Sequence, residues 1–132
     1  MSSTPYKQVL VVRKDLGMRK GKMIAQGAHA CLAAVLGASA VARNPDGGLV
    51  LAVPPEVAVW LDGLSAKIAV GVPSEEALLD VHARALAAGL PAALIRDAGR
   101  TEFHGVPTLT ACAVGPGPSA AVDAVTGELT LL

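Results

Sequence analysis

A strand that leads through a charged turn into an amphipathic helix is the feature that most restricts how this chain can fold. The strand is the β-branched run over residues 9–12, which is apolar enough to be buried on both faces. The turn over 13–21 carries charges and two glycines, and a helix is predicted to begin between Lys20 and Lys22. Strand-to-helix units of this kind favour an α/β domain.

The predicted helix has two different faces. Its apolar stripe consists of Ile24, Ala28, Cys31 and Val35. Residues at this i, i+4, i+7, i+11 spacing share one side of a helix, so the stripe is expected to pack against the core. A polar stripe on nearly the opposite side consists of Lys22, Gln26 and His29. A lysine in the first turn opposes the helix dipole, which suggests that Lys22 has a function there.

Most of the remaining chain can be divided into helices and strands. The first helix is expected to continue to Arg43, followed by a loop over 44–48, whereas residues 49–53 cannot be assigned. A second helix should start at 54–56 and bury one side. That side consists of Val57, Trp60, Leu61 and Leu64. Ser74 is predicted to cap a third helix that stops at Gly89, and residues 119–124 suit a short fourth helix.

Further strands are predicted over 67–72, 90–96 and 108–114, with the last ended by the Gly-Pro-Gly-Pro run at 115–118 and a strand-like tail over 129–132. Strands that are joined by helices should be parallel. Residues 97–107 are too few for a crossover helix, so strand 108–114 should run antiparallel to strand 90–96. The predicted fold is a three-layer α/β sandwich, with a central four-stranded mixed sheet flanked by helices.

Length and composition limit the class of protein. A chain of 132 residues suits one domain over 1–132 with a core of its own. No run approaches the roughly 20 apolar residues that span a bilayer, and the N-terminus lacks the layout of a signal peptide, so we expect a cytoplasmic protein without a membrane partner. Cys31 and Cys112 lie in apolar patterns and are expected to be unpaired thiols. No metal or cofactor is expected.

The charge is balanced in sum but uneven along the chain. Net charge is zero, which argues against broad nonspecific binding of nucleic acid. Six of the eleven basic residues nevertheless fall within the first 22 positions, against the single acid Asp15. This cluster either solvates a loop or holds phosphates. The chain has one Phe, one Tyr and one Trp, so any nucleic acid should be held mainly through its backbone.

The predicted topology brings polar residues to one rim of the sheet, because sites in α/β folds collect beyond the carboxyl ends of the strands. This rim consists of Lys22, Gln26, His29, Asp97, Arg100, Thr101, Thr108 and Thr110. Each residue also has a structural interpretation. Asp97 before Ala-Gly suits a turn capped by its own side chain, and His29 suits a histidine satisfied within the fold.

Two segments at this rim resemble known signatures. Residues 9–30, VLVVRKDLGMRKGKMIAQGAHA, resemble the N-terminal signature of type 2 peptidyl-tRNA hydrolases, and residues 94–101, LIRDAGRT, resemble the block that follows the third strand of that family. The threonine-bearing strand that ends in Gly115-Pro116 and the closing residues 125–132 are also similar. Residues 44–53 fit no pattern of the family and suit an insertion. Residues 102–107 also depart from the family pattern, which leaves open whether Thr108 or Thr110 has the family's threonine role. Thr110 fits better when counted back from Gly115.

The resemblance implies hydrolysis of the ester between peptide and tRNA, with peptidyl-tRNA as partner and a homodimer as the expected assembly. Asp97 would orient or deprotonate water, Lys22 would stabilise negative charge, and hydroxyls would donate hydrogen bonds. The expected catalytic residues are Lys22, Asp97, Thr101 and Thr110. The expected substrate-binding residues are Gln26, His29, Arg100, Thr108, Arg13, Lys14, Arg19 and Lys20. The alternatives are a non-catalytic domain that binds tRNA or protein on the same fold, and a hydrolase of another small acyl ester.

Overall fold

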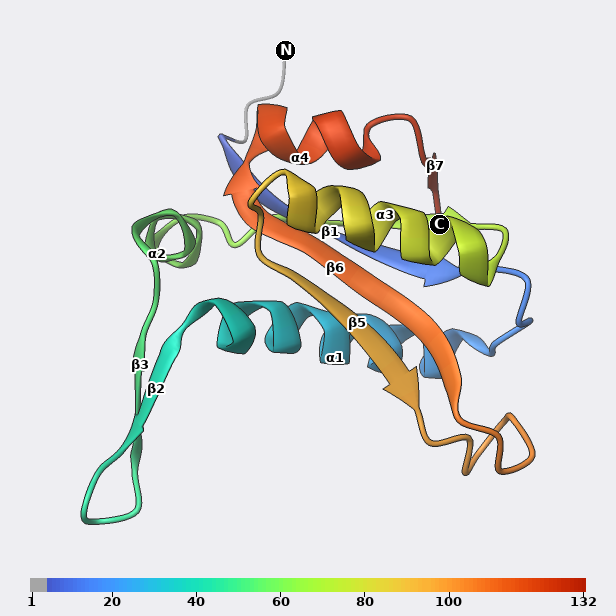
Figure 1. The fold of residues 1–132 in the computed structure, drawn as a ribbon, viewed down its shortest axis with the longest axis horizontal. Coiled ribbons are helices and arrows are strands. Elements are labelled where there is room, and N and C mark those ends of the chain that lie inside the picture. Colours follow the sequence, from blue (N-terminus) through green and yellow to red (C-terminus); the bar gives the residue numbers. More distant parts are fainter. Residues whose placement is uncertain (1–4) are drawn as a thin grey trace.

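The computed structural model describes residues 5–132 as a twisted mixed sheet with helices on both faces (Figure 1). The strands are β1 (Tyr6–Arg13), β4 (Lys67–Val72), β5 (Ala92–Asp97), β6 (Thr108–Pro118) and β7 (Thr130–Leu131), in the order β5-β6-β1-β4-β7. The predicted α/β sandwich is confirmed, but the sheet has five strands where four were expected. The fifth arises because the C-terminal tail pairs with β4 as β7.

Strand directions follow the prediction. β1 and β4 are parallel, and β6 runs antiparallel to both β1 and β5. β1 and β5 therefore point the same way, and their carboxyl ends reach the same end of the sheet. That end of the sheet carries the turn before α1 (Lys20–Ala38) and the loop that follows β5.

The core is divided between the two faces of the sheet. α3 (Glu75–Ala87) and α4 (Ser119–Thr126) cover one face, where Leu78 and Val122 pack against Val9 and Val11. α1 and α2 (Pro55–Asp62) lie on the other face. Alternate residues of a strand point to opposite faces, which is why neighbours in β1 belong to different clusters. Ser74 caps α3 as predicted, accepting a hydrogen bond from the backbone N–H of Ala77 at 3.1 Å.

The packing face of α1 matches the predicted stripe only at Val35, which is buried, and at Cys31, which is half-buried. Gly27, Ala30 and Ala34 are buried against the sheet, whereas Ile24, which belonged to the expected core stripe, is 73% exposed. Small residues let the helix backbone approach the strands closely, and a large side chain would hold it away. Gln26 lies beside Gly27 and is consequently buried, although it was expected on the polar face.

The first helix also ends earlier than predicted, at Ala38 and not at Arg43. β2 (Ala40–Arg43) pairs antiparallel with β3 (Leu49–Ala52) as a separate hairpin that projects from the body of the protein (Figure 1). The predicted loop over 44–48 forms its turn, closed by a 2.7 Å hydrogen bond from the N–H of Asn44 to the carbonyl of Gly48. Residues 40–43, which were expected to form the last turn of the helix, instead pair with residues 49–52, which could not be assigned from sequence.

Two further boundaries differ. β6 continues through residues 115–118, because Pro116 falls at an irregularity in the pairing with β1, where no ladder N–H is required. α2 buries Val57 and Trp60 as predicted, but Leu61 and Leu64 are exposed. Leu64 lies beyond the end of the helix at Asp62. Across residues 5–132, no helix has the combined length and apolar character that crossing a bilayer requires.

Candidate active site

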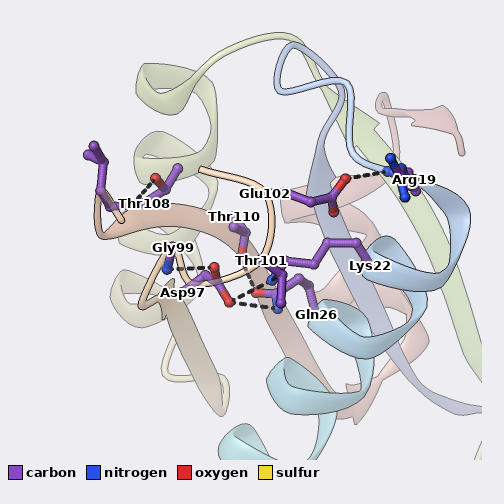
Figure 2. A network of polar contacts seen from close by, with 10 residues as sticks. Arg19, Lys22, Gln26, Asp97, Gly99, Thr101, Glu102, Thr108 and Thr110 are labelled. Atoms are coloured by element: carbon purple, nitrogen blue, oxygen red, sulfur yellow. Dashed lines mark hydrogen bonds and ion pairs between the residues drawn. The ribbon is translucent and has the colours of Figure 1, made fainter. Parts of the chain in front are cut away.

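The first turns of α1, the end of β5, the loop after it and the start of β6 meet at one end of the sheet (Figure 2). Lys22 and Gln26 come from α1, Asp97 ends β5, Thr101 lies in the following loop and Thr110 comes from β6. These five side chains form one connected set of hydrogen bonds, which we call the Lys22–Asp97 network. The sequence placed all five at a common rim, and that prediction is confirmed.

Lys22 is held by two acceptors. Its Nζ lies 2.9 Å from Oδ1 of Asp97 and donates to Oγ1 of Thr101 at 2.8 Å. The Lys22 and Asp97 side chains are 14% and 16% exposed, so water screens this pair less than an ion pair at an open surface. The ring of Phe103 lies under the ammonium, 5.7 Å from Nζ to the ring centroid.

Asp97 combines the structural and the chemical interpretations of its position. Oδ2 accepts the backbone N–H of Gly99 at 2.8 Å and so caps the turn, while Oδ1 faces Lys22 and the Nε2 of Gln26, the latter at 3.4 Å. Hydrogen bonding to Lys22 lowers the pKa of Asp97 below its usual 3.8, against the opposing effect of burial. Gly99 has a φ of +83°, and a side chain there would collide with the backbone of Val106.

A β-bulge aims Thr110 into the network. Ile95 of β5 pairs with Ala111 but Arg96 pairs with Leu109, so Thr110 is the extra residue on β6. Leu109 packs into the core under α3, whereas Ala111 belongs to a cluster on the α1 face. The bulge leaves Thr110 on the α1 side, where its fully buried hydroxyl donates a short hydrogen bond to Oε1 of Gln26. This contact orients the Gln26 amide so that its Nε2 faces Asp97.

The other predicted rim residues lie outside the network. His29 is exposed and lines a cavity of about 410 Å³ together with Gln26 and Asp97. Arg100 is exposed in the loop after β5. The hydroxyl of Thr108 donates to the carbonyl of Val106 at 2.8 Å and so closes the end of that loop. The structure thus separates the two threonines, with Thr110 in the network and Thr108 outside it.

The chain matches known proteins over nearly its whole length. Residues 6–132 match the family described as Peptidyl-tRNA hydrolase PTH2. A protein of Methanocaldococcus jannaschii named Peptidyl-tRNA hydrolase is 44% identical over 126 residues, which cover 96% of this chain and 99% of that protein. The chain belongs to the PTH2 family. An Aeropyrum pernix protein of the same name is 42% identical over 99% of both chains. A Schizosaccharomyces pombe protein named Probable peptidyl-tRNA hydrolase 2 is 44% identical over 95% of this chain and 55% of its own length.

The basic cluster of this PTH2-family chain has members in different environments. Arg13 is buried, and its guanidinium donates to both carboxylate oxygens of Asp15, at 3.0 and 2.6 Å, and to the carbonyl of Leu109 at 3.0 Å. It therefore braces the turn against β6. Three members are exposed: Arg19 and Lys20 at the start of α1, beside Lys22, and Lys14, whose side chain lies against Gly71 of β4. These three, and not Arg13, present free charge to solvent.

Sequence reasoning did not assign two residues of the loop after β5. Glu102 accepts the backbone N–H of Arg19 at 3.4 Å through Oε1, which links this loop to the start of α1 (Figure 2). Phe103 supplies the ring beneath Lys22. Its position in the chain was a usable signal, because it is the only phenylalanine and follows Asp97 closely. Within residues 5–132, no group of three or more His, Cys, Asp or Glu side chains is placed to hold a metal ion.

Proposed function

We propose that this chain hydrolyses the ester that joins the peptide to tRNA in peptidyl-tRNA, releasing free tRNA. The 2.9 Å approach of Lys22 to Asp97 carries the proposal, because it brings a cation and a carboxylate together beside a cavity that Asp97 lines. Support also comes from the match to the PTH2 family over residues 6–132 and from relatives that bear the name peptidyl-tRNA hydrolase. Ester hydrolysis requires an oriented water, stabilisation of the developing oxyanion and a proton for the leaving ribose oxygen.

Asp97 orients the attacking water. A general base works best when its pKa lies near the operating pH, and the pKa of Asp97 is lowered by Lys22. The carboxylate is therefore a weak base that remains a strong hydrogen-bond acceptor. It aims a lone pair of the water at the ester carbonyl, accepts a proton from that water as the new C–O bond forms, and passes the proton to the ribose oxygen as the ester bond breaks.

Lys22 and Thr101 stabilise charge on the substrate. The ammonium is fixed between Asp97 and Thr101, so it need not reorganise as the carbonyl oxygen becomes negative. Oγ1 of Thr101 accepts from Lys22, which leaves the threonine's own O–H to donate to the substrate.

Gln26 and Thr110 hold the carboxylate in position. Thr110 uses its only proton on Gln26, so we assign it a positioning role in place of direct donation to the substrate. His29 and Arg100, exposed at the same end of the molecule, contact the terminal nucleotide, with His29 as a secondary route for the proton. Lys14, Arg19 and Lys20 bind phosphates of the tRNA backbone.

The decisive test is release of tRNA from N-acetylaminoacyl-tRNA by the wild type, Lys22→Ala and Asp97→Ala, with folding checked by circular dichroism. We expect turnover by the wild type and its loss in both variants. A wild type that binds tRNA without turnover would instead establish the non-catalytic alternative. Equal cleavage of a free aminoacyl ester would point to a general acyl-ester hydrolase.

The cellular setting and the assembly are further proposals. A substrate produced by ribosomes favours the cytoplasm. A homodimer is consistent with the apolar side chains exposed on the β2–β3 hairpin, among them Val41 and Leu51. Light scattering coupled to size exclusion tests the dimer, and a single-chain mass across the concentration range would exclude it.

A further inference from the structure

A groove leads away from the Lys22–Asp97 network between α1 and β5. The cavity of about 410 Å³ beside Asp97 is lined on its helical side by Gln26, His29, Leu32 and Leu36, which succeed one another along α1. Its other wall is residues 94–98. We call this cavity the β5 groove. A larger cavity of about 710 Å³ lies by Pro54 and Gly89 and contains none of the network side chains.

The β5 groove runs along the backbone edge of a strand. Successive strand residues point to opposite faces, and Leu94 indeed packs with the core under α3 while Ile95 packs under α1. A cavity lined by consecutive residues of such a strand must therefore border its edge. β5 is the outermost strand and pairs only with β6 among the described strands. Every second backbone unit of β5 thus turns its N–H and C=O toward this side.

The dimensions of the groove suit a short extended peptide. Gln26 and Leu36 are ten residues apart on the helix, which corresponds to about 15 Å. An extended chain covers this length with about four to five residues, at roughly 3.3 Å each. Leu32 and Leu36 are 59% and 36% exposed, so the far end of the groove offers apolar contact.

We propose that the β5 groove holds the last four or so residues of the peptide in peptidyl-tRNA, as a strand added to the edge of β5. The inference rests on the proposed function, and the occupant follows from continuity, since Gln26 and Asp97 belong both to the groove and to the network. The ester must lie at Asp97, where β5 also ends, so the peptide runs parallel to β5. Main-chain hydrogen bonds of an added strand do not depend on side-chain identity, which lets one site accept many peptides.

Substrate length and backbone methylation test the added strand. tRNAs carrying N-acetyl-(Ala)n with n from one to six should show kcat/KM rising about ten-fold up to n of four and then levelling, as expected for a few hydrogen bonds of ordinary strength. N-methylation of single residues in the n = 4 substrate should reduce kcat/KM at alternate positions only, because one edge of a strand presents every second N–H. Indifference to both length and methylation would overturn the proposal.

A matched pair of leucines tests the groove from the protein side. Leu32→Gln should reduce kcat/KM for an N-acetyl-(Leu)4-tRNA several-fold and leave N-acetyl-leucyl-tRNA unchanged. Leu61→Gln is the control, since Leu61 is 47% exposed on α2 and lies outside the groove. Equal effects of the two variants would contradict the assignment. If the wild type cleaves substrates of every peptide length at one rate, the assignment of the groove is wrong but the proposed function stands. If it cleaves none of these substrates, the proposed function itself is wrong.

Discussion

The ammonium of Lys22 lies 2.9 Å from Oδ1 of Asp97, although 75 positions separate the two residues in the sequence. Neither side chain is fixed by the other alone. The ammonium of Lys22 also donates to Thr101, and the carboxylate of Asp97 also accepts hydrogen bonds from Gly99 and Gln26. A pair held from both ends is already arranged for the charge that develops in the reaction, and such preorganisation is what electrostatic catalysis requires.

Lys22 and Asp97 should act as one unit, so that removing either side chain lowers kcat/KM about as much as removing both. We expect Lys22→Met and Asp97→Asn each to reduce kcat/KM by about 10²–10³, the usual effect of losing one preorganised charge or donor. The double variant should be little worse than either single one, because each change already disables the pair. Single-turnover hydrolysis of N-acetylaminoacyl-tRNA measures all three. Lys67→Met is the control, since that ammonium lies over the ring of Trp60. Multiplicative losses in the double variant would show that the two residues act independently.

The acid limb of the pH profile should depend on Lys22. The pKa of Asp97 is below 3.8 because Lys22 hydrogen-bonds to it, so the wild-type carboxylate stays ionised from about pH 5 upward. The stability that it contributes is present above the unfolded pKa and lost as pH falls through the lower folded pKa. In Lys22→Gln the pKa of Asp97 should rise and the acid limb should move to higher pH. A ¹³C NMR titration of the Asp97 carboxyl follows this without requiring activity. An unchanged titration would mean that Lys22 does not hold the carboxylate ionised.

The meeting of Lys22 and Asp97 was predictable because it depends only on topology. A parallel pair of strands and a short connection to an antiparallel one leave few ways to arrange their carboxyl ends. The packing face of α1 was not predictable in the same way. Hydropathy favours Ile24 for the buried face of the helix, whereas close contact with the sheet favours Gly27 and Ala30. A single sequence does not reveal how closely the helix packs against the sheet.

Two other features depend on partners that are distant in the chain. The segment Ala40–Arg43 continues the apolar pattern of α1 and becomes a strand only because Leu49–Ala52 returns beside it. Thr110 reaches Gln26 because of the bulge opposite Ile95 and Arg96. Strict alternation along β6 would place both Thr108 and Thr110 on the face away from Gln26. Periodicity alone therefore gives no reason to choose one threonine over the other.

The two threonines of β6 should respond differently to the same substitution. Thr110→Val leaves the buried Oε1 of Gln26 without its donor, which should lower the free energy of unfolding by about 1–3 kcal/mol and reduce kcat/KM by loosening Gln26 and Asp97. Thr108→Val removes a hydrogen bond to Val106 at a half-buried position and should change both quantities much less. Urea denaturation and steady-state kinetics compare the pair. Equal kinetic losses would mean that Thr108 shares the positioning role.

Binding of tRNA should depend on salt through the exposed members of the basic cluster. Each phosphate contact contributes about 0.7–0.9 to the slope of log K against log salt concentration. Arg19→Gln and Lys20→Gln should each make that slope shallower by about this amount, because both residues are exposed beside the network. Arg84→Gln is the matched control, since Arg84 lies on α3 and pairs with Asp80 at 3.0 Å.

Fluorescence anisotropy of labelled tRNA between about 50 and 200 mM salt gives these slopes. A chain with zero net charge has no general attraction for RNA, so any steep slope must come from a local patch. If Arg84→Gln flattened the slope as much as the two α1-side variants did, the RNA would lie across α3, and the placement of the tRNA beside Lys22 would be wrong.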